Sequence, residues 1–534
     1  MNRLLDRTLL LTIALGVLLP AASASIPFKP KPKAPPKVDL GIFEGQNDIG
    51  DVHPAGTTQF DKNAKTYTLT AAGDNMWKTH DSFHYVWKKM AGDISLSADL
   101  AFPSPGANAH RKIALIFRQS LDADAVYADA ALHGSGLTAL QFRPTPGATT
   151  ADTELNFATI AEAPNRLRLE KHGDLITLYT STKDGPFQPS GASVRLHLEG
   201  TYYVGIGICS HDPNVVEKAV FSNIDLHPLT ESSTPVAADK LTLYSTLETI
   251  QLDPENPRAT VIYTKPGRFE APNWSRDGST LIFDEAGQIM SIPSAGNLPA
   301  KPLAVNIGLA TKCNGSHGFS PDGHQLAITC EMPDAPGAHI YILPATGGAP
   351  HAVSNVSSYF HSWSPDGKTI AFARPHPGGG DIFHIPAEGG EEAALTSTVG
   401  ISDDPDYSPD GQYIYFNSDR APGSMQIWRM HADGSQPEQL TTDERNNWTP
   451  HPSPDGKWIV YLSYDKDTKG HPVNKEISLF LMSLSDRKIT KLVDLLGGSG
   501  TINVPSWSPD SKALAFVSYA LEPQQSQTSS APAK

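Results

Sequence analysis

Short runs of alternating apolar and polar residues, separated by turn residues, follow one another along most of the chain. In the run Thr369–Phe372, Ile370 and Phe372 alternate with smaller residues, which is typical of a strand with one buried face. The preceding Ser364–Gly367 suits a tight turn, because proline presets φ, aspartate binds backbone N–H groups and glycine tolerates a positive φ. These stretches together predict a β-hairpin.

This hairpin motif occurs six times in the C-terminal half of the chain. Its aspartates are Asp277, Asp322, Asp366, Asp410, Asp455 and Asp510, spaced 45, 44, 44, 45 and 55 residues apart. A repeat of this length, with four short strands in each unit, is typical of a β-propeller blade. Because one repeat cannot bury its own apolar face, we expect six blades to stack around an axis.

We expect the propeller to span residues 240–520. The sixth copy is followed by one strand and then by a Gln/Ser/Ala-rich tail at 521–534, for which we expect disorder. Two further strands, at 246–252 and 260–264, precede the first copy. We expect these strands to complete the sixth blade, which closes the ring and removes open sheet edges.

Residues 39–229 lack this repeat and show alternating strands with hairpin turns, which predicts a β-sandwich and makes the whole chain all-β. The run His84–Leu96, followed by Ile113–Arg118, resembles the concanavalin-like jelly-roll modules of many exported bacterial proteins. The resemblance implies a module that binds carbohydrate or packs beside a neighbour. One group of residues is open to two interpretations, a ligand site or a polar rim: His80, Asp81, His84 and Arg118.

The N-terminus predicts export. Residues 1–24 have a basic start, a short apolar run and Ala22-Ser-Ala24 as a cleavage pattern, which indicates a signal peptide and a periplasmic or secreted protein. Residues 25–38 and 230–239 have linker compositions. The mature chain has no apolar run long enough to span a bilayer. The full sequence has a net charge of −15, which argues against nucleic acid as a partner.

We expect candidate chemistry at the end of the propeller opposite the short, uniform turns, where the connections vary. Two residues before the motif aromatic, adjacent blades carry His317 and His361, and Asp404, Asn447 and His451 lie near the same level. Two histidines and a carboxylate can bind a divalent metal or act as a base with its partner. The alternative is that they are polar residues of a water-filled channel.

A long insertion at 464–476 adds cationic residues to the same end. Lys466 and His471 in this insertion can meet an anionic ligand, or the loop can be an ordinary solvated surface. Cys313 and Cys330 lie equally far before and after the Ser320–Gly323 turn, so hairpin register places them opposite each other and favours a disulfide in an exported protein. Cys209 is expected to be a buried free thiol.

The repeat, an aromatic followed by Ser-Pro-Asp-Gly and an Ile-Ala-Phe strand, closely resembles the TolB-like (PD40, WD40-like) propeller repeat over residues 240–520. That resemblance implies an exported binding or scaffold protein. The stretches around Ser316–Ser320, Phe360–Trp363 and Asn446–Pro452 are also similar to propellers of the oligogalacturonate lyase type. This second resemblance implies that His317, His361 and His451 hold a metal beside an acidic sugar.

The leading interpretation is a non-enzymatic protein whose propeller recognises a glycan or an envelope protein, with a carbohydrate-facing jelly roll. The alternative is a metal-assisted polysaccharide lyase or another glycan-processing enzyme. In that case His317 and His361 bind a divalent metal, the only cofactor expected, and His451 or a loop lysine is the base.

Overall fold

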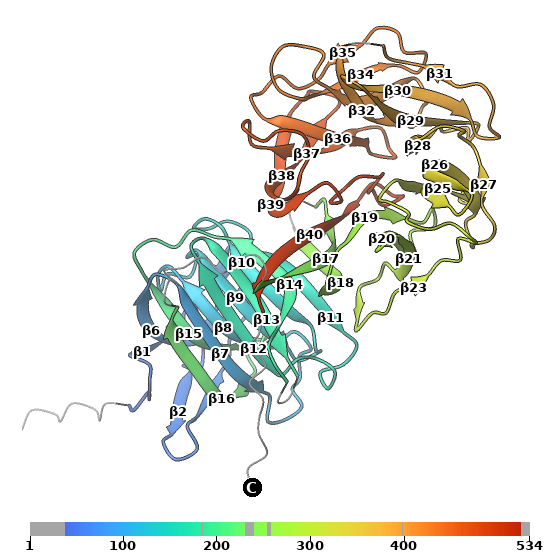
Figure 1. The fold of residues 1–534 in the computed structure, drawn as a ribbon. Coiled ribbons are helices and arrows are strands. Elements are labelled where there is room, and N and C mark those ends of the chain that lie inside the picture. The colour runs from blue at the N-terminus through green and yellow to red at the C-terminus, as the bar shows by residue number, and fades with distance from the viewer. Residues whose placement is uncertain (1–37, 183–184, 230–239, 254–257, 398, 525–534) are drawn as a thin grey trace, which may run out of the picture. The chain divides into compact units, whose positions relative to one another are not determined.

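The computed structural model describes residues 38–182, 185–229, 240–253, 258–397 and 399–524 (Figure 1). Within these ranges the regular structure is β-strand, and no helix is long and apolar enough to cross a membrane. The all-β prediction is therefore confirmed. The expected signal peptide and the linker at 230–239 lie outside the described residues, as does most of the linker at 25–38.

The N-terminal part contains two sheets that share one hydrophobic core. Leu96, Leu169 and Phe221 from one sheet and Leu115 and Ile206 from the other belong to this core and are fully or almost fully buried. The first sheet runs in the order β14 (Gln188–Arg195), β13 (Leu175–Ser181), β12 (Arg166–His172), β7 (Ile94–Ala101), β16 (Glu217–Pro228), β3 (Thr66–Ala71) and β2 (Thr57–Asp61). The assignment of this part to the concanavalin-like class stays a prediction.

The second sheet starts in the N-terminal part and continues into the propeller. Its first strands are β1 (Gly45–Ile49), β6 (Phe83–Ala91), β15 (Thr201–Cys209), β8 (Lys112–Arg118), β9 (Tyr127–His133), β10 (Thr138–Arg143) and β11 (Ala151–Phe157). β11 then pairs in parallel with β18 (Arg258–Pro266) and with the short β22 (Asn297–Leu298). The repeat-free part and the repeats are thus joined by backbone hydrogen bonds.

Arg118 and Asp81 are not rim residues. Both side chains are almost fully buried and form an ion pair with 2.6 Å between Nη1 and Oδ2. His84 is also buried, with Nδ1 2.7 Å from Asp48 and Nε2 2.9 Å from Thr58. Only His80 of this group is exposed. The four residues therefore do not form one accessible site, because three of them are buried and bonded to other side chains of the protein.

The repeats form four-stranded units around the propeller axis (Figure 1). From the innermost strand outward they are β19 (Phe269–Trp274), β20 (Thr280–Glu285), β21 (Gln288–Pro293), β23 (Leu303–Ala304); β24 (His317–Phe319), β25 (Gln325–Met332), β26 (Ala335–Pro344), β27 (His351–Ala352); β28 (Tyr359–Trp363), β29 (Thr369–His376), β30 (Gly379–Pro386), β31 (Ala393–Ala394); β32 (Gly400–Tyr407), β33 (Tyr413–Ser418), β34 (Gln426–His431), β35 (Glu438–Gln439); and β36 (Asn446–Pro452), β37 (Trp458–Tyr464), β38 (Val473–Ser483), β39 (Ile489–Gly498). A short parallel pairing of β30 with β32 joins the third unit to the fourth.

The sixth blade is built from both ends of the repeat region. β40 (Ala513–Pro523) pairs antiparallel with β17 (Leu241–Gln251) along its whole length, and β17 pairs with β18. The expected completion of this blade by N-terminal strands is therefore confirmed. β17 begins earlier than expected and β40 continues to Pro523, into the predicted tail, because each strand gives the other a hydrogen-bonding partner.

The turn motif uses the chemistry that its residues predict. Ser364 Oγ donates to Asp366 Oδ1 at 2.7 Å and accepts from the N–H of Thr369, while Gly367 has a φ of +71°. The hydrogen bonds from Ser364 and from the Lys368 N–H lower the pKa of Asp366. In the preceding blade, Cys313 and Cys330 form the expected disulfide, while Cys209 is a buried free thiol.

Candidate functional site

One pocket of about 450 Å³ lies at the end of the propeller opposite the repeated turns. All six blades contribute to it, which makes it the point of convergence of the whole ring. We call it the propeller mouth and define it by Glu270, Ser316, His361, Asp403, Asp404, His471, Ser499 and Asn503.

Bulges in the innermost strands aim side chains into this end of the channel. In β32 the register shifts between Asp403 and Asp406, and Asp404 has a φ of +51°. β19 and β36 have bulges at the matching level, with positive φ at Ala271 and Thr449. A regular strand sends successive side chains to opposite faces, whereas a bulge breaks that alternation. The adjacent Asp403 and Asp404 can therefore both approach one neighbour.

That neighbour is His361, which lies on β28 of the preceding blade. Its Nε2 lies 3.5 Å from Asp403 Oδ1, and its Nδ1 lies 3.5 Å from Asp404 Oδ1. One ligand atom from each of the three residues lies within 4.8 Å of the others. A nitrogen and two carboxylate oxygens at this spacing are donors that suit a divalent ion such as Mn²⁺ or Zn²⁺. The three residues therefore fit the metal that the lyase resemblance implies.

Burial and mutual charge set the protonation of this cluster. Burial alone would lower the pKa of His361, but Asp403 and Asp404 outweigh it and raise the pKa. Burial and the charge of Asp403 raise the pKa of Asp404 to about 6. Burial acts upward on the pKa of Asp403 too, but the hydrogen bond and charge of His361 lower it overall. The imidazole and the two carboxylates thus act on one another: the carboxylates favour the charged form of His361, and His361 favours the charged form of Asp403.

His317 does not join this cluster, although it occupies the same sequence position as His361. It is fully buried, and burial lowers its pKa to about 4, so the imidazole is neutral. Among the described residues neither of its ring nitrogens has a hydrogen-bond partner. It is not part of the pocket lining at the propeller mouth.

The other residues proposed from sequence have separate positions. His471 lies in the mouth and packs against Trp448, with 4.6 Å between ring centroids. Asn447 is buried and donates to the Asp443 carboxylate at 3.1–3.2 Å, which is a structural role. Lys466 is largely exposed and pairs with Glu444 at 3.6 Å.

His451 lies deeper in the channel. Its Nδ1 is 2.9 Å from Asp406 Oδ2, and its Nε2 is 2.6 Å from the carbonyl oxygen of Ile502. Both nitrogens are therefore engaged. Asp406 in turn lines a second pocket, of about 250 Å³, at the end of the channel that carries the repeated turns.

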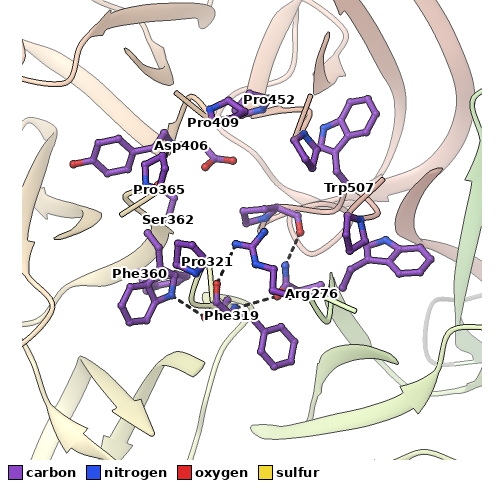
Figure 2. Close-up of a pocket in the computed structure, with 18 residues that line it drawn as sticks. Arg276, Phe319, Pro321, Phe360, Ser362, Pro365, Asp406, Pro409, Pro452 and Trp507 are labelled. Atoms are coloured by element: carbon purple, nitrogen blue, oxygen red, sulfur yellow. Dashed lines mark hydrogen bonds between the residues drawn. The ribbon is translucent and has the colours of Figure 1, made fainter. Parts of the chain in front are cut away.

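Figure 2 shows this second pocket, in which the turn prolines Pro321, Pro365 and Pro409 surround the opening. Arg276 replaces the proline in the first copy of the motif and donates from Nη2 to the carbonyl oxygen of Phe319 at 3.4 Å (Figure 2). Its pKa is lowered by burial, against which the charge of Asp406 acts. The pocket at this end has a smaller volume and contains fewer carboxylates than the propeller mouth.

Comparisons with known proteins agree with the repeat. The TolB beta propeller domain model (PD40) matches residues 319–478. An uncharacterized protein of Agrobacterium fabrum, Atu1656, is 42% identical over 260 residues, which cover 48% of this chain and 87% of that protein. This chain belongs to the TolB-like β-propeller family. The predicted family is thereby confirmed for the propeller.

Two further proteins are similar to part of this TolB-like chain. The solved structure of a putative TolB from Agrobacterium tumefaciens is 40% identical, with a TM-score of 0.49, and the match covers 52% of this chain and 99% of that one. The Tol-Pal system protein TolB of Francisella tularensis is 26% identical over 154 residues. That match covers 27% of this chain and about a third of TolB (34%).

Sequence reasoning placed too little weight on two carboxylates of the mouth in this TolB-like protein. Asp403 was visible as part of the acidic run before the fourth motif, but its approach to His361 depends on the bulge. Glu270 stands four residues before the first motif aromatic, and burial raises its pKa. The useful signal is the distance from the motif aromatic. Asp403 stands four residues before Tyr407, just as Glu270 stands four residues before Trp274.

Proposed function

We propose that this TolB-like protein is a periplasmic binding protein that recognises an envelope protein through its propeller mouth. The observation that supports this most is the convergence of His361, Asp403 and Asp404 in a pocket to which all six blades contribute. Function on a rigid scaffold is usually carried by variable segments at one end. The relatives named Tol-Pal system protein TolB make an envelope partner the natural choice.

The mouth is acidic, which bears on the partner's chemistry. Glu270, Asp403 and Asp404 line it, and the charge of Arg374 beside them is matched by Glu392. A basic side chain from a partner would complement this charge, and complementary charge favours encounter and register. The N-terminal part would add a concanavalin-like, glycan-facing module to the same protein.

A photo-crosslinker placed at the mouth tests this proposal. Tyr359 lines the mouth and is half-buried, so p-benzoylphenylalanine at this position would contact a docked partner. The matched control is the same replacement of Tyr413, an equally half-buried tyrosine just after a repeated turn. We expect irradiation of envelope extracts to give a defined crosslinked protein from position 359 only. Equal products from both positions, or none from position 359, would contradict the proposal.

The second candidate is a metal-assisted glycan lyase, and the geometry of the His361–Asp403–Asp404 cluster favours it. These residues would hold the ion, and the ion would supply charge that stabilises a substrate carboxylate. His451 is poorly placed as the base, because both of its ring nitrogens are already bonded. This candidate requires turnover of polygalacturonate, followed by the ultraviolet absorbance of the unsaturated product, that needs both a divalent ion and His361.

A further inference from the structure

The outer face of strands β8 to β11 carries an unusual set of buried charges. Residues of these strands alternate between the hydrophobic core and this second face. The second face holds Lys112, Arg118, Asp129, His133, Gln141, Arg143, Asp152 and Glu154, all less than a tenth exposed. Burying charge is costly unless it is paired and hydrogen-bonded. The cluster therefore needs an explanation in structure or in function.

Part of the cluster has a structural role. Asp81 accepts from Arg118 at 2.6 Å and from both Nη atoms of Arg143 at 2.7–2.8 Å. Asp81 belongs to the small hairpin of β4 (Met76–Trp77) and β5 (His80–Asp81). Bidentate bonds between arginine and carboxylate are strong and directional. They hold this hairpin across the face and place Trp77 beside the remaining charges.

The rest of the cluster surrounds a cavity of about 280 Å³. Its lining includes Trp77, Lys112, His133, Gln141, Asp152 and Glu154. This volume is just below the lower end of ligand pockets, which begin at roughly 300 Å³. The cavity is therefore of a size for a small ligand or for the end of a longer one.

Some polar groups that line this cavity lack the hydrogen bonds that buried groups normally make. Lys112 Nζ donates to the carbonyl oxygen of Met76 at 3.2 Å and to Gln141 Oε1 at 3.3 Å, rather than to a carboxylate. In the described part of the chain, buried Asp152 Oδ1 accepts no hydrogen bond, and Arg258 Nε lies 3.7 Å away. An unsatisfied buried acceptor costs about 1–3 kcal/mol, so a donor from a ligand would be favourable here.

The balance of groups indicates the class of ligand. Lys112 and Arg258 offset Asp152 and Glu154, so the cavity does not select for a strong net charge. Burial and the charge of Glu154 raise the pKa of Asp152 to about 7, while burial lowers the pKa of His133. Donors and acceptors thus both line the cavity, together with the half-buried indole ring of Trp77. A polyhydroxylated ring with C–H faces matches this arrangement better than a charged ligand.

We infer that this cavity binds a neutral sugar unit. The sugar hydroxyls donate to Asp152 and Glu154 and accept from Lys112 and Gln141, and Trp77 packs along the C–H face of the ring. The inference deepens the proposed glycan-facing role of the N-terminal part and is independent of the propeller mouth.

Saturation-transfer NMR and titration of the full chain test the inference. The probes are D-glucose, D-galactose and N-acetylglucosamine, with D-galacturonate and D-glucosamine as charged counterparts. We expect at least one neutral sugar to bind, and Trp77→Ala and Asp152→Asn each to weaken it by at least about tenfold. Trp87→Ala is the matched control, because Trp87 is a half-buried tryptophan of β6 outside the cavity.

Three outcomes would overturn the inference. They are binding of no neutral sugar, preference for a charged sugar, and neutral-sugar binding that survives both cavity variants. Thermal unfolding of each variant separates loss of the site from loss of the fold, and Trp77→Phe provides a milder second change at the rim. If sugar binding were lost in His361→Ala and kept in both cavity variants, the sugar site would be the propeller mouth and not this cavity. The crosslink from position 359 reports on the mouth alone, so the two proposals can fail separately.

Discussion

At the scale of single residues, Glu248 shows how burial makes a side chain sensitive to pH. It lies on β17, is 8% exposed and accepts a hydrogen bond from Ser518 on β40. Burial raises its pKa to about 7, despite the opposing effect of that hydrogen bond. The native state therefore keeps a proton that the unfolded chain loses near its ordinary pKa of about 4.3. Stability falls as the pH rises from there through 7, because the unfolded state then binds fewer protons.

Replacing Glu248 by glutamine removes this titration but keeps an acceptor for Ser518. We expect Glu248→Gln to be more stable than the wild type at pH 8, by on the order of 1–3 kcal/mol, and the gain to shrink toward pH 4.5. The measurement is urea unfolding at several pH values. Glu391→Gln, which changes an exposed glutamate, serves as the control. A gain that does not depend on pH would show that Glu248 is not the titrating group.

The positions of His361, Asp404 and His317 were only partly predictable from the sequence. The spacing from the motif aromatic placed His361 at the channel with Asp404 nearby, and in the structure His361 Nδ1 lies 3.5 Å from Asp404 Oδ1. The same spacing cannot separate His361 from His317, which is fully buried away from the mouth. The difference depends on bulges and on the neighbouring blade, which are tertiary features without a local signal.

At the scale of elements, β17 is the strand that closes the propeller. It pairs with β40 on one side and with β18 on the other, and Leu247 at its centre is fully buried in a cluster with Val517. The sequence predicted this closure because the last repeat lacks strands that the segment before the first repeat supplies. The parallel pairing of β11 with β18 had no such signal, because nothing in either strand specifies a partner so distant in sequence.

We expect Leu247→Ala to lower the free energy of unfolding by about 2–5 kcal/mol, through lost burial and the cavity left behind. The control is Leu303→Ala on β23, where the leucine is 73% exposed, and its effect should stay within about 0.5 kcal/mol. Denaturant unfolding followed by tryptophan fluorescence measures both variants. Similar small effects from the two variants would mean that β17 does not contribute to closing the ring.

At the scale of the whole molecule, the repeat period specified the ring, and the ring in turn creates the mouth. Three inner strands, β19, β28 and β32, are far apart in sequence, yet they bring Glu270, His361 and the Asp403–Asp404 pair to one pocket. The order of the blades and the end with variable connections were predictable, since both follow from the period and the turn chemistry. The identity of the bound partner is not encoded in that geometry, which fixes only the charge and the shape that it must match.

The most direct test of the account is partner capture through the mouth with and without metal chelation. The full chain, crosslinked from position 359, is compared in EDTA and in Mn²⁺ with the double variant Asp403→Asn/Asp404→Asn, and with Asp366→Asn, a repeated-turn aspartate, as control. We expect the crosslinked envelope protein to persist in EDTA and in the control, and to be lost in the double variant. Capture that survives the double variant would contradict a role for the mouth, whereas capture abolished by EDTA alone would contradict metal-independent binding.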